Sequence, residues 1–279
     1  MKPLLLFLAL IATLRASPPT DFIRIDQDDT HARLQTSVTS YQKDNKTVTL
    51  IGAIHIGDAE YYQTLNQEFT NYDALLFELI GGENIAKTLN GKPRPTQEPD
   101  GRPAEGLRDL YNTFASTMQL AQQIDLVDYT PPHFIHADLT AAEYARVTAE
   151  KGDDLLSFAL ETSVNTSEIT EKPFGGMNMG IVMRAILSGD GSAMKLEYMK
   201  LMEQGDESSA AITGQNIVID DRNTKCFQVL AKELATEKNT FGIFYGAAHF
   251  PDMEERLNAL GFKKVEHRWI TAWNVPKSN

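Results

Sequence analysis

Two stretches near opposite ends of the chain share one pattern, TVTLIGAIHIGDAE at residues 47–60 and TFGIFYGAAHFPDME at residues 240–254. Counted from Gly52 and Gly246, five of nine positions are identical at a constant offset of 194. Each copy is an apolar run typical of a buried strand, followed by Gly-Ala-x-His and then by an aspartate where a helix N-cap belongs. The repeat predicts an α/β fold in which each histidine lies at the carboxyl end of a strand, where open α/β sheets bind ligands.

The residues around the first copy extend this prediction to a larger unit. Residues 33–41 alternate apolar and polar side chains, and Asp44-Asn45 supplies a turn, so a hairpin leads into the buried strand at 47–54. Asp58 is expected to cap a helix that runs to about Tyr72, and ALLFELI at residues 74–80 is a second buried strand. Strand, helix and strand in this order predict a βαβ unit.

The middle of the chain is predicted to be mainly helical. Thr140 and Glu143 have the spacing of a capping box for a helix that ends near residue 149. Residues 124–129 are predicted to be a short strand. Further helices are expected at residues 107–123, 155–162, 181–187, 193–203, 217–237 and 252–260, and further strands at 240–247 and 262–273. We therefore expect an α/β fold with a mixed sheet, helices on its faces, a lid or disordered loop at about 81–106, and a helical central insertion at about 107–215.

Composition limits the classes of partner. Among 279 residues, 38 are Asp or Glu and 26 are Lys or Arg, so the formal net charge is −12. No Lys/Arg cluster interrupts this acidic surface, which argues against binding of nucleic acid. The single cysteine, Cys226, excludes an intrachain disulfide and a cysteine-based zinc knuckle.

The N-terminus has the pattern of a secretory signal peptide. Lys2 precedes an apolar run from Leu4 to Leu14, and small residues follow at Ala16 and Ser17. The run is shorter than the roughly 20 residues that span a bilayer, so a transmembrane anchor is not expected. We predict a signal peptide at 1–16, one domain at 17–279, and a secreted or periplasmic location. The oligomeric state has no signal in the sequence.

The two repeated histidines and one glutamate are the candidate catalytic centre. Neutral imidazole is a common metal ligand, and two imidazoles from separate strands supply part of a catalytic site. Glu78 ends an otherwise apolar strand, and either a metal ion or an arginine would offset the cost of burying its charge. We predict His55, Glu78 and His249 as ligands of a divalent metal ion (Zn, Mn or Co) with an open position for water, which suits hydrolysis. Glu78 is either a ligand or the general base, and the sequence does not separate these two roles. The simpler alternative is that both histidines bond neighbouring backbone groups.

Residues on the predicted helix at 217–237 are candidates for binding substrate. Arg222 would clamp a substrate carboxylate or an oxyanion, or else form a surface salt bridge. Asn223 would orient a ligand or face solvent, and Cys226 is expected to be a small core residue. Six methionines between Met177 and Met202 predict a core face, with a soft apolar substrate surface and a copper site as alternatives.

These elements together resemble the TraB/PrgY/GumN family, which includes the Tiki metalloproteases. They are GAIH at 52–55, Glu78, DDRN at 220–223 and GAAH at 246–249, within a span from Thr47 to Trp273. The resemblance implies a fold like that of erythromycin esterase and the haem-binding ChaN proteins, and metal-dependent peptide hydrolysis with both histidines and the glutamate at the active centre. We therefore expect an exported metal-dependent hydrolase that cleaves a peptide or ester bond in a peptide or small-molecule substrate. The alternative is an envelope protein that holds haem, metal or a signalling peptide in the same cleft without turnover.

Overall fold

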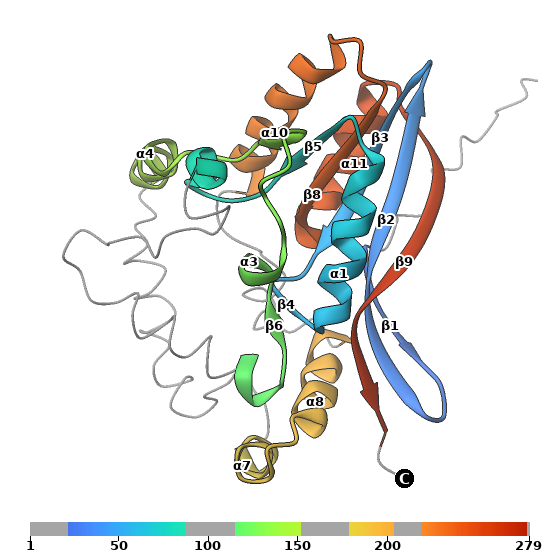
Figure 1. Ribbon diagram of the computed structural model, residues 1–279, viewed down its shortest axis with the longest axis vertical. Helices are drawn as coiled ribbons and strands as arrows, with labels where there is room; N and C mark the ends of the chain where they lie inside the picture. The colour runs from blue at the N-terminus through green and yellow to red at the C-terminus, as the bar shows by residue number, and fades with distance from the viewer. Residues whose placement is uncertain (1–21, 88–114, 152–178, 204–218, 278–279) are drawn as a thin grey trace, which may run out of the picture.

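A seven-stranded mixed sheet organises the protein (Figure 1). The computed structural model describes residues 22–87, 115–151, 179–203 and 219–277. The strands run in the order β1-β2-β3-β8-β5-β7, and β9 pairs with the other side of β2. Their bounds are β1 Ile23–Gln27, β2 His31–Lys43, β3 Lys46–Ala53, β5 Ala74–Phe77, β7 Phe134–His136, β8 Thr240–Gly246 and β9 Lys263–Pro276. A separate two-stranded sheet pairs β4 (Ile56–Gly57) with β6 (Ala121–Gln122).

The sheet is antiparallel at one end and parallel at the other. β1, β2 and β9 run antiparallel to their neighbours, whereas β3, β8, β5 and β7 are mutually parallel. The predicted hairpin is confirmed, because β2 and β3 pair up to Lys43 and Lys46 and Asp44 adopts φ of 52° in the turn. β8, from the C-terminal copy of the repeat, lies between β3 and β5. The two copies of the repeat are therefore neighbours in the sheet.

Helices cover both faces of the parallel strands. The helical segments are α1 Ala59–Glu68, η1 Phe69–Asn71, η2 Gly82–Lys87, α3 Gln123–Leu126, α4 Ala141–Lys151, α7 Met179–Ser188, α8 Ser192–Glu203, α10 Ile219–Leu234, η4 Ala247–His249 and α11 Phe250–Ala259. Alternate strand residues point to opposite faces, and each face has its own apolar cluster. Ile51 and Phe244 pack with α1, while Leu50 and Ile243 pack with α10 and α11.

Local sequence signals explain several element boundaries. The predicted capping box is confirmed, because the Thr140 backbone N–H donates to Glu143 and the Glu143 N–H donates to the Thr140 hydroxyl. Asp58 precedes α1 as predicted, but its side chain makes no capping bond. Its carboxylate accepts instead from Lys195 and from the backbone N–H of Asn274. Asp58 therefore ties the start of α1 to α8 and β9.

Some sequence-based boundaries were wrong. Residues 124–129 were expected to be a strand, yet residues 123–126 form the short helix α3, and the strands beside it are β6 and β7. Gln123 accounts for this difference, because its backbone N–H bonds the carbonyl of His55 and its side chain bonds Tyr129. A tertiary contact thus overrides the β-propensity of the segment.

Parts of the predicted chain lie outside the described residues. These are the signal peptide at 1–16, most of the expected lid at 81–106, the helix expected at 155–162, and Met177. Of the methionines in the predicted segment, Met194 and Met199 are buried in the cluster on the α1 side of the sheet. Among the described residues, no helix combines the length and hydropathy that crossing a membrane requires.

Candidate functional site

Four neighbouring parallel strands each place one polar side chain just beyond their carboxyl ends. His55 follows β3, His249 follows β8, Glu78 follows β5 and Asp138 follows β7. These strands are adjacent in the order β3-β8-β5-β7. The predicted placement of both histidines at the carboxyl edge is therefore confirmed, and Glu78 and Asp138 lie at the same edge.

Arg222 of α10 lies at the centre of this group. Its guanidinium bonds both oxygens of Asp138, with Nε to Oδ1 at 3.0 Å and Nη2 to Oδ2 at 2.7 Å, and Nη2 also donates to Glu78 Oε1 at 2.5 Å. The side chains of Arg222, Glu78 and Asp138 are only 4%, 6% and 0% exposed. An arginine, one of the two counterions that the sequence allowed, therefore neutralises Glu78.

The charge of Glu78 is stabilised by several groups at once. Burial acts to raise the pKa of Glu78, but the charge of Arg222 and the nearby imidazoles of His249 and His55 oppose this and hold the pKa at about 2. The second carboxylate oxygen accepts from the backbone N–H of Gly246 at 2.5 Å. Glu78 is thus ionised at neutral pH, and it is attached to both the β8 end and α10.

Asn223 determines the tautomer of His249. Its amide nitrogen donates to the His249 carbonyl at 3.2 Å and to Asp252 at 2.7 Å, so its amide oxygen must face the imidazole. That oxygen lies 2.6 Å from His249 Nδ1, which must therefore carry the proton. Burial lowers the pKa of His249, so the ring is neutral and Nε2 is its basic nitrogen. Nε2 lies 3.5 Å from Arg222 Nη1 and 3.6 Å from Glu78 Oε1.

Gln123 determines the tautomer of His55 in the same way. The Gln123 amide nitrogen donates to the Tyr129 hydroxyl at 3.0 Å, which directs its amide oxygen to His55 Nδ1 at 3.3 Å. Nδ1 is therefore the protonated nitrogen and Nε2 the basic one. His249 is fully buried, whereas His55 is half-buried. Of the two histidines, His55 is therefore the more exposed.

Gly52, the first glycine of the repeated motif, packs closely against β2. A Cβ at this position would lie 3.1 Å from the Ser37 carbonyl oxygen and 3.1 Å from Thr36 Cβ. The Tyr61 hydroxyl donates to the Gly52 carbonyl at 2.7 Å. The end of β3 is thereby held against β2 and α1, which positions the segment that carries His55.

As they stand, the side chains do not fit the predicted metal centre. The 3.6 Å between Glu78 Oε1 and His249 Nε2 could be spanned by one ion at about 2.0 to 2.1 Å from each. However, the Arg222 guanidinium bonds the same glutamate oxygen, so a divalent cation there would face a positive charge at close range. Within the described part of the chain, no three His, Cys, Asp or Glu side chains are gathered as a metal site requires. The ligand roles of His55, Glu78 and His249 stay predictions.

The structure assigns interior partners to the two residues predicted to bind substrate. Arg222 contacts Glu78 and Asp138, and Asn223 contacts His249 and Asp252; both side chains are buried. Their substrate contacts stay predictions, and in this arrangement they position the other groups. Cys226 is buried among apolar residues, as predicted. Burial raises the pKa of its thiol.

Sequence reasoning did not identify Asp138 or Gln123. The segment FIHADL at 134–139 offered a weak signal, since a short apolar run ends in an aspartate just before the capping box. Gln123 had no signal, because only the folded chain brings it to His55. His133 and His136 are half-buried, and their rings bond the carbonyls of Phe69 and Leu79.

Comparisons with family models, curated proteins and solved structures give no match to this chain.

Proposed function

We propose that this protein is a hydrolase of peptide or ester bonds whose reaction centre is His55, Glu78 and His249, positioned by Arg222 and Asn223. The observation that supports this proposal is the state of the two imidazoles. Each is held by an amide oxygen in the tautomer with a basic Nε2, beside an ionised carboxylate. Packing needs apolar contacts at strand ends, and it does not need two imidazoles held in one tautomer.

In this proposal His55 is the general base. Its Nε2 takes a proton from water or a substrate group, and the negative charge of Glu78 stabilises the imidazolium that forms. Gln123 keeps the ring in place while the proton is transferred, because its oxygen continues to accept from Nδ1. His249 has a different role, since it is fully buried and faces Arg222. It holds the guanidinium against both carboxylates and so sets the charge near His55.

The predicted divalent cation is a separate part of the proposal. Arg222 already neutralises Glu78, so the proton transfer above needs no ion. Metal content of protein purified without a chelating tag, and rates with EDTA or with added Zn²⁺, Mn²⁺ or Co²⁺, decide its role. Turnover that is lost with EDTA and restored by one ion would assign the ion to the reaction. Unchanged turnover in EDTA would assign the reaction to the side chains alone.

The test of the hydrolase proposal is a screen of p-nitrophenyl esters and internally quenched peptides. We expect turnover by the wild-type chain and a loss of about 10² to 10⁴-fold in kcat/KM for His55→Ala. His31→Ala, at a half-buried histidine at the start of β2, is the matched control and should keep the full rate. No turnover above buffer, or a full rate in His55→Ala with an unchanged melting temperature, would refute the proposal. One-to-one haem binding without turnover would favour the binding alternative.

Export is proposed on the pattern of residues 1–16, which lie outside the described residues. The test is fractionation of the native host, with N-terminal sequencing of the recovered chain. Cleavage after Ala16 in an exported fraction is the expected result. A full-length chain confined to the cytoplasm would refute it.

A further inference from the structure

β9 is the edge strand of the sheet, and a cavity follows its outer side. Within the described residues β9 pairs with β2 alone, and Figure 1 shows it along the outer side of the sheet. The cavity has a volume of about 760 Å³, within the range of ligand pockets. It is lined by four consecutive β9 residues, 268–271, and by α1 residues Glu60, Tyr61 and Thr64.

The cavity lies over the edge of β9 rather than on one face of the sheet. Consecutive strand residues point to opposite faces. Ile270 packs in the apolar cluster on the α1 side, whereas Thr271 bonds Gln35 and Trp269 stacks under Arg24 on the other side. Side chains from both faces can line one cavity only where that cavity straddles the strand edge. The space therefore runs where a further strand would pair.

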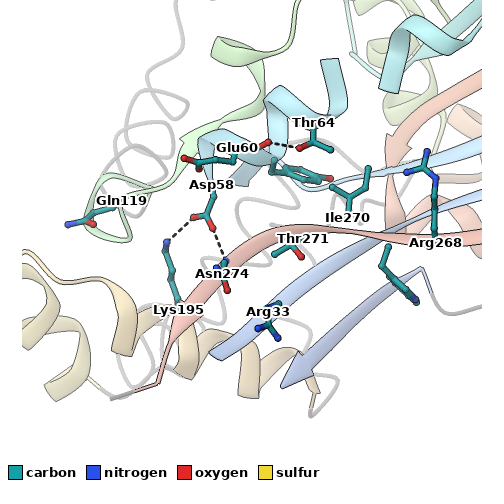
Figure 2. Close-up of a pocket in the computed structure, with 12 residues that line it drawn as sticks. Arg33, Asp58, Glu60, Thr64, Gln119, Lys195, Arg268, Ile270, Thr271 and Asn274 are labelled. Atoms are coloured by element: carbon teal, nitrogen blue, oxygen red, sulfur yellow. Dashed lines mark hydrogen bonds and ion pairs between the residues drawn. The ribbon is translucent and has the colours of Figure 1, made fainter. Parts of the chain in front are cut away.

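The part of the edge that lines the cavity, residues 268–271, has a regular backbone and a defined end. β9 has irregularities in its pairing near Val265 and Ala272, and between them residues 266–271 keep a regular register with β2. Beyond Thr271 the edge is closed by Asp58, whose backbone N–H donates to the Ala272 carbonyl and whose carboxylate accepts from the Asn274 N–H. Figure 2 shows Asp58 between Lys195 and Asn274 at one end of the cavity and Arg268 at the other.

The cations that line the cavity already have acidic partners in the protein. Arg33 pairs with Asp26 and Asp28, Lys195 with Asp58, and Arg268 with Glu68. Charge therefore gives little basis for selecting a ligand here. The part of the cavity beside residues 268–271, the slot, offers a strand edge with room for side chains on both faces of the sheet. Such a site recognises an extended main chain, as in strand addition to a sheet edge.

We propose that the slot beside residues 268–271 binds an extended peptide segment with uncharged side chains at its centre, as an added strand on β9. A second copy of the chain fits less well, because its own α1 flanks its β9 and would have to enter the same slot. Lys263, Lys264 and Arg268, with the two irregularities, are also features by which edge strands avoid pairing with themselves. The inference goes beyond the proposed hydrolysis and does not rest on it.

The experiment uses a random linear heptapeptide library displayed on phage and selected against the wild-type chain. Enriched peptides are then synthesised with a fluorophore, and Kd is measured by anisotropy. Thr64→Trp places a bulky side chain in the slot from the exposed face of α1. Gln63→Trp, its neighbour outside the cavity lining, is the matched control. We expect at least about tenfold weaker binding to Thr64→Trp and unchanged binding to Gln63→Trp.

Main-chain pairing has a signature that side-chain binding lacks. Every second residue of an added strand bonds the edge. Two peptides are therefore compared, one N-methylated at its odd residues and the other at its even residues. We expect one of the two to lose binding and the other to keep it. Bound peptide should also slow hydrogen exchange in residues 268–271. The proposal is overturned if no peptide is enriched, if Thr64→Trp binds the peptide equally well, or if the two N-methylated peptides bind with the same Kd. A concentration-dependent dimer that Thr64→Trp abolishes would instead assign the edge to a second copy.

Discussion

Replacing Arg222 with methionine should be among the most destabilising single changes in this protein. The substitution keeps most of the side-chain volume, but it leaves the carboxylates of Glu78 and Asp138 buried without a counterion. Their side chains are 6% and 0% exposed. Breaking a buried ion pair by removing one partner costs about 3 to 5 kcal/mol. The pKa of Glu78 is lowered although burial acts to raise it, and the charge of Arg222 is the largest of the effects that lower it, so removing Arg222 removes the main stabilisation of the buried carboxylate.

The same substitution should reverse the pH dependence of stability. In the wild-type protein the pKa of Glu78 is lower in the folded than in the unfolded state, so its contribution is present above pH 4.5 and is lost as pH falls towards about 2. Without the guanidinium, burial raises the pKa of Glu78 above its unfolded value. The folded variant then binds more protons than the unfolded chain, so it should be less stable at pH 7 than at pH 5. The wild-type chain should not lose stability over that interval through this group.

Urea unfolding followed by circular dichroism at pH 5 and pH 7 measures both effects. The triple variant Arg222→Met, Glu78→Gln, Asp138→Asn is the control, because it removes all three charges and should recover much of the lost stability. The reasoning fails if Arg222→Met costs less than about 1 kcal/mol, a value typical of an exposed ion pair. It also fails if the single variant keeps the wild-type pH dependence. If Arg222→Met does not fold at pH 7, refolding at pH 5 still shows whether the variant is more stable at the lower pH.

Two further changes test the positioning of the site and the packing of α8. Asn223→Leu removes the acceptor of the His249 Nδ1 proton and should lower the free energy of unfolding by about 1 to 3 kcal/mol. ¹H–¹⁵N NMR of the imidazole should show loss of the single Nδ1–H tautomer. A retained tautomer would contradict the role assigned to Asn223. Gly191→Ala places a Cβ about 2.5 Å from Met118 Cα and from the Thr117 carbonyl oxygen, so thermal unfolding should show a loss of about 1 to 3 kcal/mol. Gly189→Ala is a comparison variant, because no atom of the described residues lies within 4 Å of the added Cβ and its φ of 68° alone should cost about 1 to 2 kcal/mol. Full stability of Gly191→Ala would exclude the steric explanation.

The sequence predicted those parts of the fold that have local signals. The strand before each histidine, the hairpin at Asp44, the capping box at Thr140 and the long helix that carries Arg222 were all expected near their observed positions. Each depends on residues within a few positions of one another, where apolar periodicity, turn residues and caps act. The repeat at residues 52–60 and 246–254 added one long-range prediction, that both histidines lie at the carboxyl edge of the sheet, and this is confirmed.

The charges around Glu78 could not be assigned in the same way. The sequence indicated that a buried glutamate needs a counterion, but a metal ion and an arginine met that need equally well. The choice depends on contacts of Glu78 with Arg222, and of Arg222 with Asp138, across 144 and 84 residues. No local pattern encodes such contacts. Gln123 is a similar case. It was expected to end the helix at 107–123, whereas it begins the short helix α3, and its bonds to His55 and Tyr129 join segments that no local pattern connects.

The arrangement of amides around the two histidines separates their roles more clearly than the repeated motif does. The motif makes His55 and His249 equivalent, and both rings donate from Nδ1 to a side-chain amide. However, the amide that bonds His249 belongs to α10 beside Arg222, and Nε2 of the buried His249 ring lies 3.6 Å from a Glu78 oxygen and 3.5 Å from the Arg222 guanidinium. The amide of His55 belongs to the short helix α3, and its ring is half-buried. A proton taken up by His55 can exchange with solvent, whereas one taken up by His249 would add a positive charge beside Arg222. The duplicated motif thus yields one histidine suited to proton transfer and one suited to holding the charges in place.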